Sequence, residues 1–281
     1  MSKVVLCPNV TRDEGLACTL QVKHMLEQKG HDVLVSPVCG EVPDVDAMPL
    51  EEALPGAQLL VSLGGDGTIL HIAPRVMRYN VPLVAVNLGH KGFLTELDRT
   101  TLEKLTEAAD GHFEIVPRMM LDVEIYRGDE RIFFDTAINE ALISGIVQNV
   151  RVTALGDGER ILTFSGDGII VASPTGSTAY SMSAGGPLVE PSADNIILTP
   201  ICAHMLAARS FVLTAERIVT VCPQDIGPEK RCILSVDGRG MTDLQDGDRV
   251  MIRRSAYKLL MAHLGLKSFY ETAFEKLGER E

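Results

Sequence analysis

The feature that most constrains this chain is a glycine-rich turn placed directly after an apolar run. The segment Gly64-Gly65-Asp66-Gly67-Thr68 follows Leu59–Leu63. Such runs are typical of parallel strands that are covered by helices on both faces. Three glycines allow positive φ angles and a close approach of the backbone to a ligand, and successive N–H groups cradle phosphate oxygens. We therefore expect an α/β domain with a phosphate-binding loop at the end of this strand.

Asp66 is unusual in such a loop, because a carboxylate repels phosphate groups. We expect it to hold a metal ion, to accept a hydrogen bond from a hydroxyl group or to act as a general base. The alternative is an ordinary tight turn with a solvated aspartate. The glycines are not followed by G-K-[ST], and Leu70 stands where the dinucleotide-binding fingerprint has its third glycine. Walker-type loops and ordinary Rossmann hydride chemistry are therefore disfavoured.

Strand and helix signals alternate over the first hundred residues and then give way to strands joined by hairpin turns. The apolar run Val4–Cys7 predicts a strand, and Thr11–Glu14 has the capping-box pattern of a helix start. We predict an α/β nucleotide-binding domain at residues 1–100 and a β-rich domain at residues 101–254. Residues 255–281 are expected to pack back on the first domain. The leucines of the first helix that should face inward are Leu16, Leu20 and Leu26.

Composition narrows the range of partners and compartments. The 281 residues carry a formal net charge of −12 without basic blocks, so neither a nucleic acid nor an anionic membrane is an expected partner. No apolar run approaches the ~18 residues of a membrane span, and the N-terminus lacks a signal pattern, so we expect a cytoplasmic protein. Six cysteines form no C-x-x-C pair and are expected to be buried, reduced thiols: Cys7, Cys18, Cys39, Cys202, Cys222 and Cys232.

Two short polar motifs in the second half suit a nucleoside. Asn139-Glu140 follows the expected strand Ile132–Ile138, and an amide beside a carboxylate can bind a sugar diol. A solvated strand end is the alternative. Asp167 lies between two glycines before an apolar strand and could accept a hydrogen bond from an exocyclic amine, or could belong to a hairpin turn.

The run Ser173–Tyr180 carries a richer pattern. Pro174 fixes a turn, Gly176 permits a close approach, and Ser177 or Thr178 could cap a short helix whose N-terminus favours anions. Tyr180 could stack on a base, whereas a purely structural cap would explain the hydroxyl groups equally well. The seven histidines show no metal-ligand spacing, so we expect no histidine metal site.

In their order along the chain, these segments closely resemble the bacterial NAD kinases. The resemblance spans roughly residues 3–255, and its most specific part is the run Pro174–Tyr180 together with Asn139-Glu140. The glycine-rich loop alone is also similar to diacylglycerol, sphingosine and phosphofructo-kinases. The matching segments are Leu63–Thr68, Asn87–Thr95, Asn139-Glu140, Gly166–Val171, Ser173–Pro187, Thr199–His204 and Val236–Gly238.

The resemblance implies phosphorylation of the adenosine 2′-hydroxyl of NAD by ATP, with polyphosphate as an alternative donor and a divalent cation, Mg²⁺ or Mn²⁺, accompanying ATP. It also implies a β-sandwich second domain and a homodimer or homotetramer whose NAD sites borrow residues from a neighbour. Asp66 would take the hydroxyl proton, and the donor loop would comprise Gly64, Gly65, Gly67 and Thr68. The implied NAD-binding residues are Asp66, Gly67, Phe93, Asn139, Glu140, Arg151, Asp167, Thr175, Thr178, Ala179, Tyr180 and Ser183. Further candidates are His71, Ser165, His204, Asp237 and Arg239.

Several positions depart from the commonest family pattern. Ala203 stands where Pro often precedes the histidine, Ser165 where a basic residue is frequent, and Arg239 where Gln is frequent. Pro74 is expected to interrupt the helix that begins near Thr68.

Two other functions stay open at this point. A lipid kinase could share the glycine-rich loop, but it should have an apolar acceptor cleft or a basic membrane-facing surface, which the net charge of −10 over residues 101–250 disfavours. A module that only senses NAD or NADP would use Asp66 to bind a ribose without catalysis. The partners that we expect are therefore the small molecules NAD and ATP.

Overall fold

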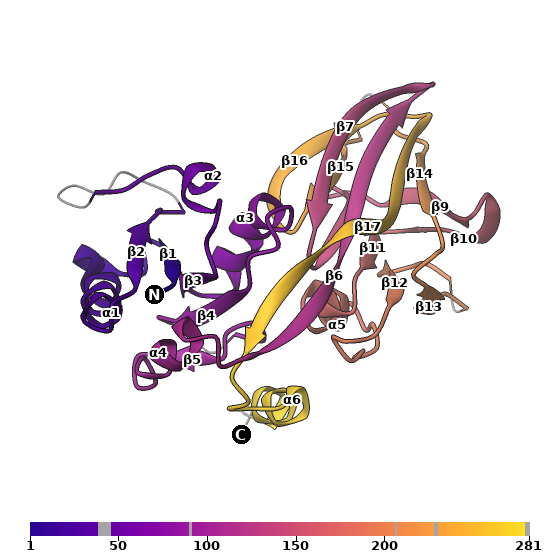
Figure 1. Cartoon of the computed structure of the whole chain (residues 1–281). Helices are drawn as coiled ribbons and strands as arrows, with labels where there is room; N and C mark the ends of the chain where they lie inside the picture. The colour runs from indigo at the N-terminus through magenta and orange to yellow at the C-terminus, as the bar shows by residue number, and fades with distance from the viewer. Residues whose placement is uncertain (39–45, 90–91, 206, 228–229, 279–281) are drawn as a thin grey trace. The chain divides into compact units, whose positions relative to one another are not determined.

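The computed structural model describes residues 1–38, 46–89, 92–205, 207–227 and 230–278. Two of the residues discussed above, Cys39 and His90, lie outside these ranges. The chain forms two compact units (Figure 1). The first comprises Met1–Pro117 and Leu259–Glu281, and the second comprises Arg118–Lys258.

The first unit is built on a parallel sheet in the order β4-β3-β1-β2. Register pairs such as Val61 with Leu6 and Val84 with Val61 keep the strands in parallel alignment. The strands are β1 (Lys3–Pro8), β2 (Asp32–Val35), β3 (Leu59–Gly64), β4 (Leu83–Asn87) and the short β5 (Leu97–Asp98) beside β4. The helices are η1 (Glu14–Leu16), α1 (Ala17–Gln28), α2 (Leu50–Ala53), α3 (Asp66–Val76), α4 (Lys104–Ala109) and α6 (Phe269–Gly278).

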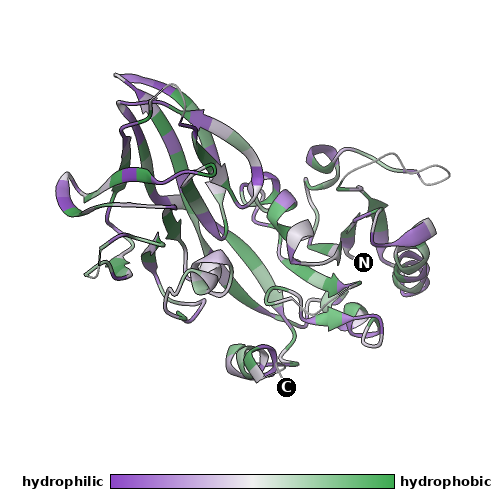
Figure 2. Ribbon diagram, turned by 180° about the vertical axis from the view of Figure 1, so that it is seen from behind, coloured by the Kyte–Doolittle hydropathy of each residue, from purple (hydrophilic) through white to green (hydrophobic). Residues whose placement is uncertain are grey.

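The apolar runs that predicted strands fill the interior of this unit. Every residue of β3 and β4 is buried, and a cluster that includes Val61 and Val86 packs against Val22 and Leu26 of α1. Figure 2 shows hydrophobic residues following these strands. The predicted α/β fold class is confirmed for this unit.

The start of α1 differs from the predicted capping box. Thr11 bonds to Asn9 instead, and the fully buried Asp13 accepts hydrogen bonds from the N–H groups of Cys18 (2.9 Å) and Thr19 (2.8 Å) and from the Thr19 hydroxyl (2.6 Å). A single carboxylate thus satisfies N–H groups in the first turn, where helices lack internal partners. The prediction for Leu20 was also wrong, since its side chain is exposed, whereas Leu16 and Leu26 are buried as expected.

Pro74 does not interrupt α3, contrary to expectation. The helix runs from Asp66 to Val76 with Pro74 inside it. Proline removes one N–H donor and crowds the preceding turn. The buried face of α3, which includes Ile69, Ile72 and Val76, offsets that cost by packing in the interior.

The second unit is a β-sandwich, as predicted. One sheet has the order β13-β12-β11-β8-β15-β16, and the other contains β10-β9-β14-β17 together with the β6–β7 hairpin. The strands are β6 (Glu114–Arg127), β7 (Glu130–Ala137), β8 (Glu140–Gly145), β9 (Val150–Gly156), β10 (Glu159–Gly166), β11 (Gly168–Ala172), β12 (Asn195–Ile201), β13 (Phe211–Thr214), β14 (Val219–Gln224), β15 (Cys232–Val236), β16 (Arg239–Leu244) and β17 (Asp248–His263). Two short helical segments, η2 (Thr175–Thr178) and α5 (Tyr180–Ser183), follow β11.

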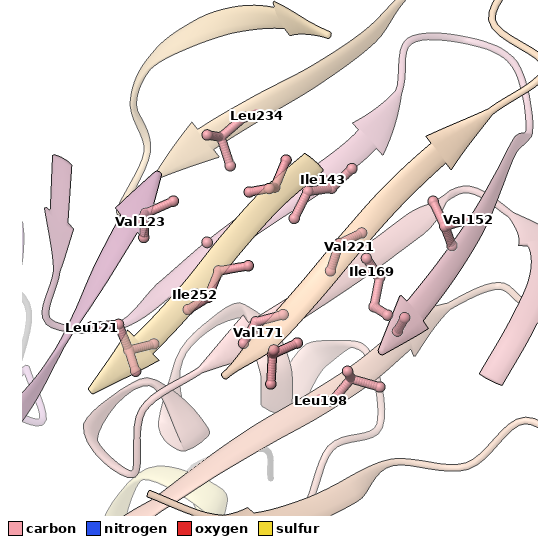
Figure 3. Packing of buried hydrophobic residues seen from close by; sticks show 14 of the residues in the cluster. Leu121, Val123, Ile143, Val152, Ile169, Val171, Leu198, Val221, Leu234 and Ile252 are labelled. Carbon is pink, nitrogen blue, oxygen red and sulfur yellow. The ribbon is translucent and has the colours of Figure 1, made fainter. Parts of the chain in front are cut away.

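The two sheets of the sandwich share one hydrophobic core. Ile143 and Ile169 of one sheet pack in the same cluster as Val152, Val221 and Ile252 of the other (Figure 3). Each of these strands alternates inward and outward residues, as the period-two pattern requires. Two long strands, β6 and β17, continue past this unit into residues 114–117 and 259–263 of the first.

Cysteines and membrane spans complete the comparison with the sequence. The five described cysteines are free, and burial raises the pKa of Cys7 and Cys232 to about 12. Cys202 is exposed and Cys222 partly so, which corrects the expectation that all would be buried. Among the described residues, no helix is both long and apolar enough to cross a membrane.

The Asp13 cap yields the first testable prediction. Asp13→Ala leaves the N–H groups of Cys18 and Thr19 and the buried Thr19 hydroxyl without their acceptor, so we expect the free energy of unfolding to fall by about 2 kcal/mol. Urea denaturation followed by circular dichroism measures this change. Glu14→Ala, at an exposed neighbour, is the control and should change stability by less than about 0.5 kcal/mol. Equal effects of the two substitutions would contradict the assignment.

Candidate functional site

The glycine-rich turn after β3 opens helix α3 and is shaped by Thr68. The Thr68 hydroxyl accepts hydrogen bonds from the Gly65 N–H (3.3 Å) and from the Asn9 amide (3.2 Å). A Cβ atom on Gly64 would lie 2.2 Å from this hydroxyl oxygen, so Gly64 is required by space. A Cβ on Gly65 or Gly67 would meet nothing within 4 Å. These two glycines therefore leave their backbone open to a ligand.

The reason for the glycines differs from the prediction in one respect. None of Gly64, Gly65 and Gly67 has a positive φ angle; Gly65, for example, is extended at −155°. The loop thus uses glycine to allow a close approach of other groups to its backbone, and not to adopt a left-handed conformation.

Asp66, the first residue of α3, is held by the turn that follows β4. Its Oδ2 accepts the N–H of Phe93 at 2.7 Å, and its Oδ1 accepts the N–H of Leu94 at 3.2 Å. A Cβ on Gly92 would lie 1.8 Å from Oδ1, so the carboxylate occupies the space that a side chain at position 92 would fill. The carboxylate is therefore bonded to the backbone on both oxygens and only partly exposed, unlike a fully solvated aspartate in an ordinary turn.

Burial raises the pKa of Asp66 above its usual range. The N–H groups of Phe93 and Leu94 and the positive charge of Lys276 act in the opposite direction. A carboxylate with a raised pKa that is fixed by two N–H groups is suited to accepting a proton. Of the candidates in the first unit, the structure thus brings Phe93 and the glycine-rich loop to Asp66. His71 is exposed on α3 and shows no bond to these groups.

In the second unit, Asp237 fixes the backbone of the Asn139-Glu140 motif. Its buried carboxylate accepts the N–H groups of Ile138 (2.8 Å), Asn139 (2.9 Å) and Glu140 (2.9 Å). Asp237 lies in the turn between β15 and β16, with φ at 47°, and Arg239 donates to its Oδ2 at 3.3 Å. A side chain remote in sequence therefore sets the conformation of the motif.

Arg239 links three acceptors around the same motif. Besides Asp237, it donates to the carboxylate of Asp135 (3.0 Å) and to the Thr136 carbonyl (2.6 Å). Its side chain is 15% exposed, so most of the guanidinium is committed to these internal contacts. Arg239 supports the Asp237 turn in this structure.

Glu140 is a partly buried side chain, one of whose carboxyl oxygens, Oε2, is buried and unsatisfied. Burial and the like charge of Asp237 raise its pKa from 4.5 to about 8. Among the described residues, Glu140 Oε2 has no hydrogen-bond partner, and neither does the buried Thr175 hydroxyl. Buried polar atoms without partners are rare in folded proteins. Two of them lie at one end of the β8–β11 pair, where they are free to bond to water or to a polar ligand.

The segment Ser173–Thr178 packs directly on Asn139. The Asn139 carbonyl accepts the Ser173 N–H at 2.8 Å, and a Cβ on Gly176 would lie 2.2 Å from the same oxygen. The structure thereby brings Asn139, Glu140 and Thr175 together.

The hydroxyl groups of this segment make local bonds. Ser177 bonds to Val189, and the Thr178 hydroxyl donates to the Thr175 carbonyl at 3.1 Å. No side chain caps α5, so the predicted cap by Ser177 or Thr178 is wrong; Ala179 occupies that position. Tyr180 and Ser183 are exposed, and Ala179 is partly buried.

A second group of candidates lies at the other end of β11. Ser165 pairs in register with Arg151, and the His204 N–H donates to the Ser165 carbonyl at 2.8 Å. Asp167 precedes β11 and interacts with Cys202, whose thiol pKa it raises by hydrogen bonding. Five residues of β11 separate Asp167 from Ser173, which corresponds to about 20 Å along an extended strand. Within one chain, these residues and Glu140 do not share one contact site.

The described residues contain no group of three or more His, Cys, Asp or Glu side chains placed to hold a metal ion.

Comparison with known proteins accounts for both halves of the chain. Residues 5–114 match the model of the ATP-NAD kinase N-terminal domain, and residues 137–264 match that of the ATP-NAD kinase C-terminal domain. The chain belongs to the NAD kinase family. The family resemblance inferred from the motifs is therefore confirmed.

Relatives in the NAD kinase family align over nearly the whole chain. An NAD kinase from Ruminiclostridium cellulolyticum is 33% identical over 286 residues, covering 100% of this chain and 99% of the relative. An NAD kinase from Moorella thermoacetica is 35% identical over 283 residues, covering 99% of this chain and 90% of the relative.

Two solved structures of NAD and NADH kinases have the same fold. Yeast NADH kinase complexed with NADH superposes with a TM-score of 0.82 at 25% identity, covering 100% of this chain and 89% of that one. An NAD kinase from Archaeoglobus fulgidus in complex with ATP superposes with a TM-score of 0.75 at 25% identity, covering 98% of each chain.

Sequence reasoning on this NAD kinase family member missed some residues that the structure makes important. Gly92 lies in the matching segment Asn87–Thr95, but the motifs assigned it no role, and Lys276 was not among the candidate residues. Nothing in their local sequence distinguishes them, since their significance comes from the contact with Asp66 and Phe93.

Glu140 generates a prediction about stability. Its pKa is about 8 in the folded chain and near 4.5 when exposed, so the folded state binds more protons between these values. The free energy of unfolding should therefore fall as the pH rises from about 4.5 to about 8, and Glu140→Gln should abolish that loss.

Urea denaturation at about pH 5 and about pH 9 measures the effect. We expect Glu140→Gln to be more stable than the parent at the higher pH and similar to it at the lower. Glu130→Gln, at an exposed position of β7, is the control and should have the same free energy of unfolding as the parent at both pH values. A parallel pH dependence of parent and Glu140→Gln would show that Glu140 is ionised throughout.

Proposed function

We propose that this chain transfers the γ-phosphoryl group of ATP to the adenosine 2′-hydroxyl of NAD, giving NADP and ADP. The observation that carries the proposal is Asp66, a partly buried carboxylate fixed by the N–H groups of Phe93 and Leu94 beside an open glycine backbone. Membership of the NAD kinase family and full-length relatives named NAD kinase support the choice of acceptor.

Asp66 serves as the general base in this proposal. A sugar hydroxyl is a poor nucleophile until its proton is accepted, and a fixed carboxylate both takes that proton and orients the oxygen. The oxygen then attacks the γ-phosphorus, the bond from that phosphorus to the bridging oxygen breaks, and ADP leaves. The backbone at Gly65 and Gly67 leaves room for the donor phosphates, and N–H groups in the first turn of a helix such as α3 bind phosphate oxygens.

The second unit provides groups for binding NAD. Protonated at neutral pH, Glu140 can donate one hydrogen bond and accept others, and the unsatisfied Thr175 hydroxyl offers a further contact. Asn139 adds an amide on a backbone fixed by Asp237. We propose that exposed Tyr180 stacks on a base and that Thr178, Ala179 and Ser183 belong to the same binding surface.

We propose that the divalent cation enters with the donor as Mg·ATP or Mn·ATP. The described residues hold no cluster of three metal-ligating side chains, which fits a cation coordinated mainly by phosphate oxygens and water. Its positive charge neutralises the phosphates during transfer.

Arg151, Ser165, Asp167 and His204 support a proposal about assembly. They are polar and clustered, yet about 20 Å of strand separates Asp167 from the Ser173 segment. We propose that they contribute to the NAD site of a neighbouring copy in a cytoplasmic homodimer or homotetramer.

One assay separates this proposal from its two rivals. Incubation with ATP, Mg²⁺ and NAD, followed by detection with an NADP-specific dehydrogenase, should show NADP formation that stops in excess chelator and returns with Mg²⁺ or Mn²⁺. NAD binding without NADP would indicate a sensor, and phosphorylation of a diacylglycerol or sphingoid acceptor in place of NAD would indicate a lipid kinase. Full turnover in excess EDTA would refute the role of the cation.

Asp66→Asn tests the base directly. The substitution keeps the size of the side chain but removes its charge and basicity, so kcat should fall by ~10² to 10⁴-fold with a much smaller change in the affinity for NAD. Steady-state kinetics and NAD titration measure the two quantities. Asp32→Asn, at an exposed position of β2, controls for the loss of one negative charge.

Gly92→Ala tests the position of the same carboxylate. The added Cβ would lie 1.8 Å from Asp66 Oδ1, so the carboxylate must move and kcat should fall although Asp66 is present.

A kcat of Asp66→Asn within a few-fold of the parent would remove the base assignment.

A further inference from the structure

The segment that holds Asp66 also holds the end of the chain. Glu96, just beyond the turn, accepts the N–H groups of Leu264 and Leu266 at 2.9 Å each and pairs with His263 at 3.2 Å. These bonds fix the chain where β17 ends and lead into α6, the yellow helix at the C-terminus in Figure 1. The last helix is therefore anchored on the strand-end segment that contacts the base.

Lys276, in the last turn of α6, completes this connection. Its ammonium lies 4.2 Å from the centroid of the Phe93 ring, within the range of a cation–π contact. The N–H of Phe93 donates to Asp66 at 2.7 Å. The same residue is thus held through its ring by the last helix and through its backbone by the base.

Packing of an apolar face does not explain how α6 is held. Of its ten residues, only Ala273 is buried, whereas Tyr270, Phe274 and Leu277 are among the exposed large side chains. A helix that buries so little apolar surface gains little from the hydrophobic effect. Contacts of polar and charged groups, the Lys276–Phe93 contact among them, therefore contribute to placing the end of α6.

The charge of Lys276 also acts on Asp66. Burial raises the pKa of Asp66, and the ammonium of Lys276 opposes that shift by favouring the ionised form. Other ionisable groups on the elements around this turn are Arg12, close to Gly89, His71 on α3 and the Glu96–His263 pair.

We propose that Lys276 is a positioning residue for phosphoryl transfer, which fixes the Phe93 turn against Asp66 and places a positive charge beside the carboxylate. This inference rests on the proposed function. It assigns to the C-terminal helix a part in the reaction that the glycine-rich loop, which contains no lysine, does not supply.

Three variants test the proposal. Lys276→Met removes the charge at similar length, and Lys276→Arg keeps a cation that can also lie over an aromatic ring. Lys104→Met is the control, because it removes the charge of a partly exposed lysine on α4 that is paired with Glu107. The measurements are kcat and KM for NAD and ATP across pH, using the full-length chain.

We expect Lys276→Met to lower kcat about tenfold or more, with KM for NAD changed less than about threefold, because misplacement of a base affects turnover more than binding. The acid limb of its kcat profile should move to higher pH, since Asp66 then ionises less readily. Lys276→Arg should restore most of the kcat of the parent and return the acid limb to nearly the same pH as in the parent. Lys104→Met should match the parent in both respects. A loss that is equal at every pH, or that Lys276→Arg does not restore, would show a merely structural role and overturn the proposal.

A measurement independent of turnover separates this inference from the proposed function. Carbon-13 NMR of the Asp66 carboxyl group, assigned by its loss in Asp66→Asn, gives its titration in the parent and in Lys276→Met. The midpoint should be higher in Lys276→Met, whether or not the parent makes NADP. An unchanged midpoint would overturn the proposal even in an active enzyme, whereas a parent that makes no NADP would overturn the proposed function.

Discussion

The arrangement of the first unit depends on the hydrogen bonds made to one partly buried carboxylate. Asp66 stands at the start of α3, yet its two oxygens are bonded by N–H groups that follow β4. These bonds tie the ends of two neighbouring parallel strands together, and the absent side chain at Gly92 leaves room for them. Burial raises the pKa of this group, and the N–H groups that fix its position oppose that rise, so the contacts that hold the carboxylate also moderate its basicity.

In the second unit the roles are exchanged: a carboxylate holds the backbone, whereas in the first unit backbone N–H groups hold the carboxylate. There the carboxylate of Asp237 is the structural part, and it fixes the backbone on which Asn139 and Glu140 are carried. The proximity of Asp237 raises the pKa of Glu140, so the support is also an electrostatic influence. Arg239 also donates a hydrogen bond to Asp237, and its positive charge partly offsets the negative charge of Asp237 and Glu140. A functional carboxyl group and a structural one thus depend on each other.

Sequence patterns predicted the fold class and many of the groups that the structure brings together. The apolar run Leu59–Leu63 located β3 because buried parallel strands leave few positions for polar residues. The cap of α1 could not be identified in this way, because Thr11 and Asp13 both suit a helix start and only the packing chooses Asp13. Pro74 misled for a related reason: the local cost of a proline is visible in sequence, whereas the packing that offsets it is not.

The candidate site was predictable where the chemistry lies within a motif and not where it crosses the chain. Asp66 and Glu140 stand in recognisable segments, but the contacts of Gly92 with Asp66 and of Lys276 with Phe93 join residues far apart in sequence. Short motifs do not encode such distances. The separation of Asp167 from Glu140 also follows from the length of β11 and not from either motif.

The raised pKa of Glu140 has a consequence for the heat of ligand binding. A group that titrates at about 8 is partly ionised in ordinary buffers, so a ligand that prefers one form takes up or releases a fraction of a proton when it binds. The buffer supplies or absorbs that fraction, and its own ionisation enthalpy enters the calorimetric signal. Binding enthalpies recorded in phosphate and in Tris would therefore differ, and the difference would report how the ligand meets the unsatisfied oxygen of this side chain.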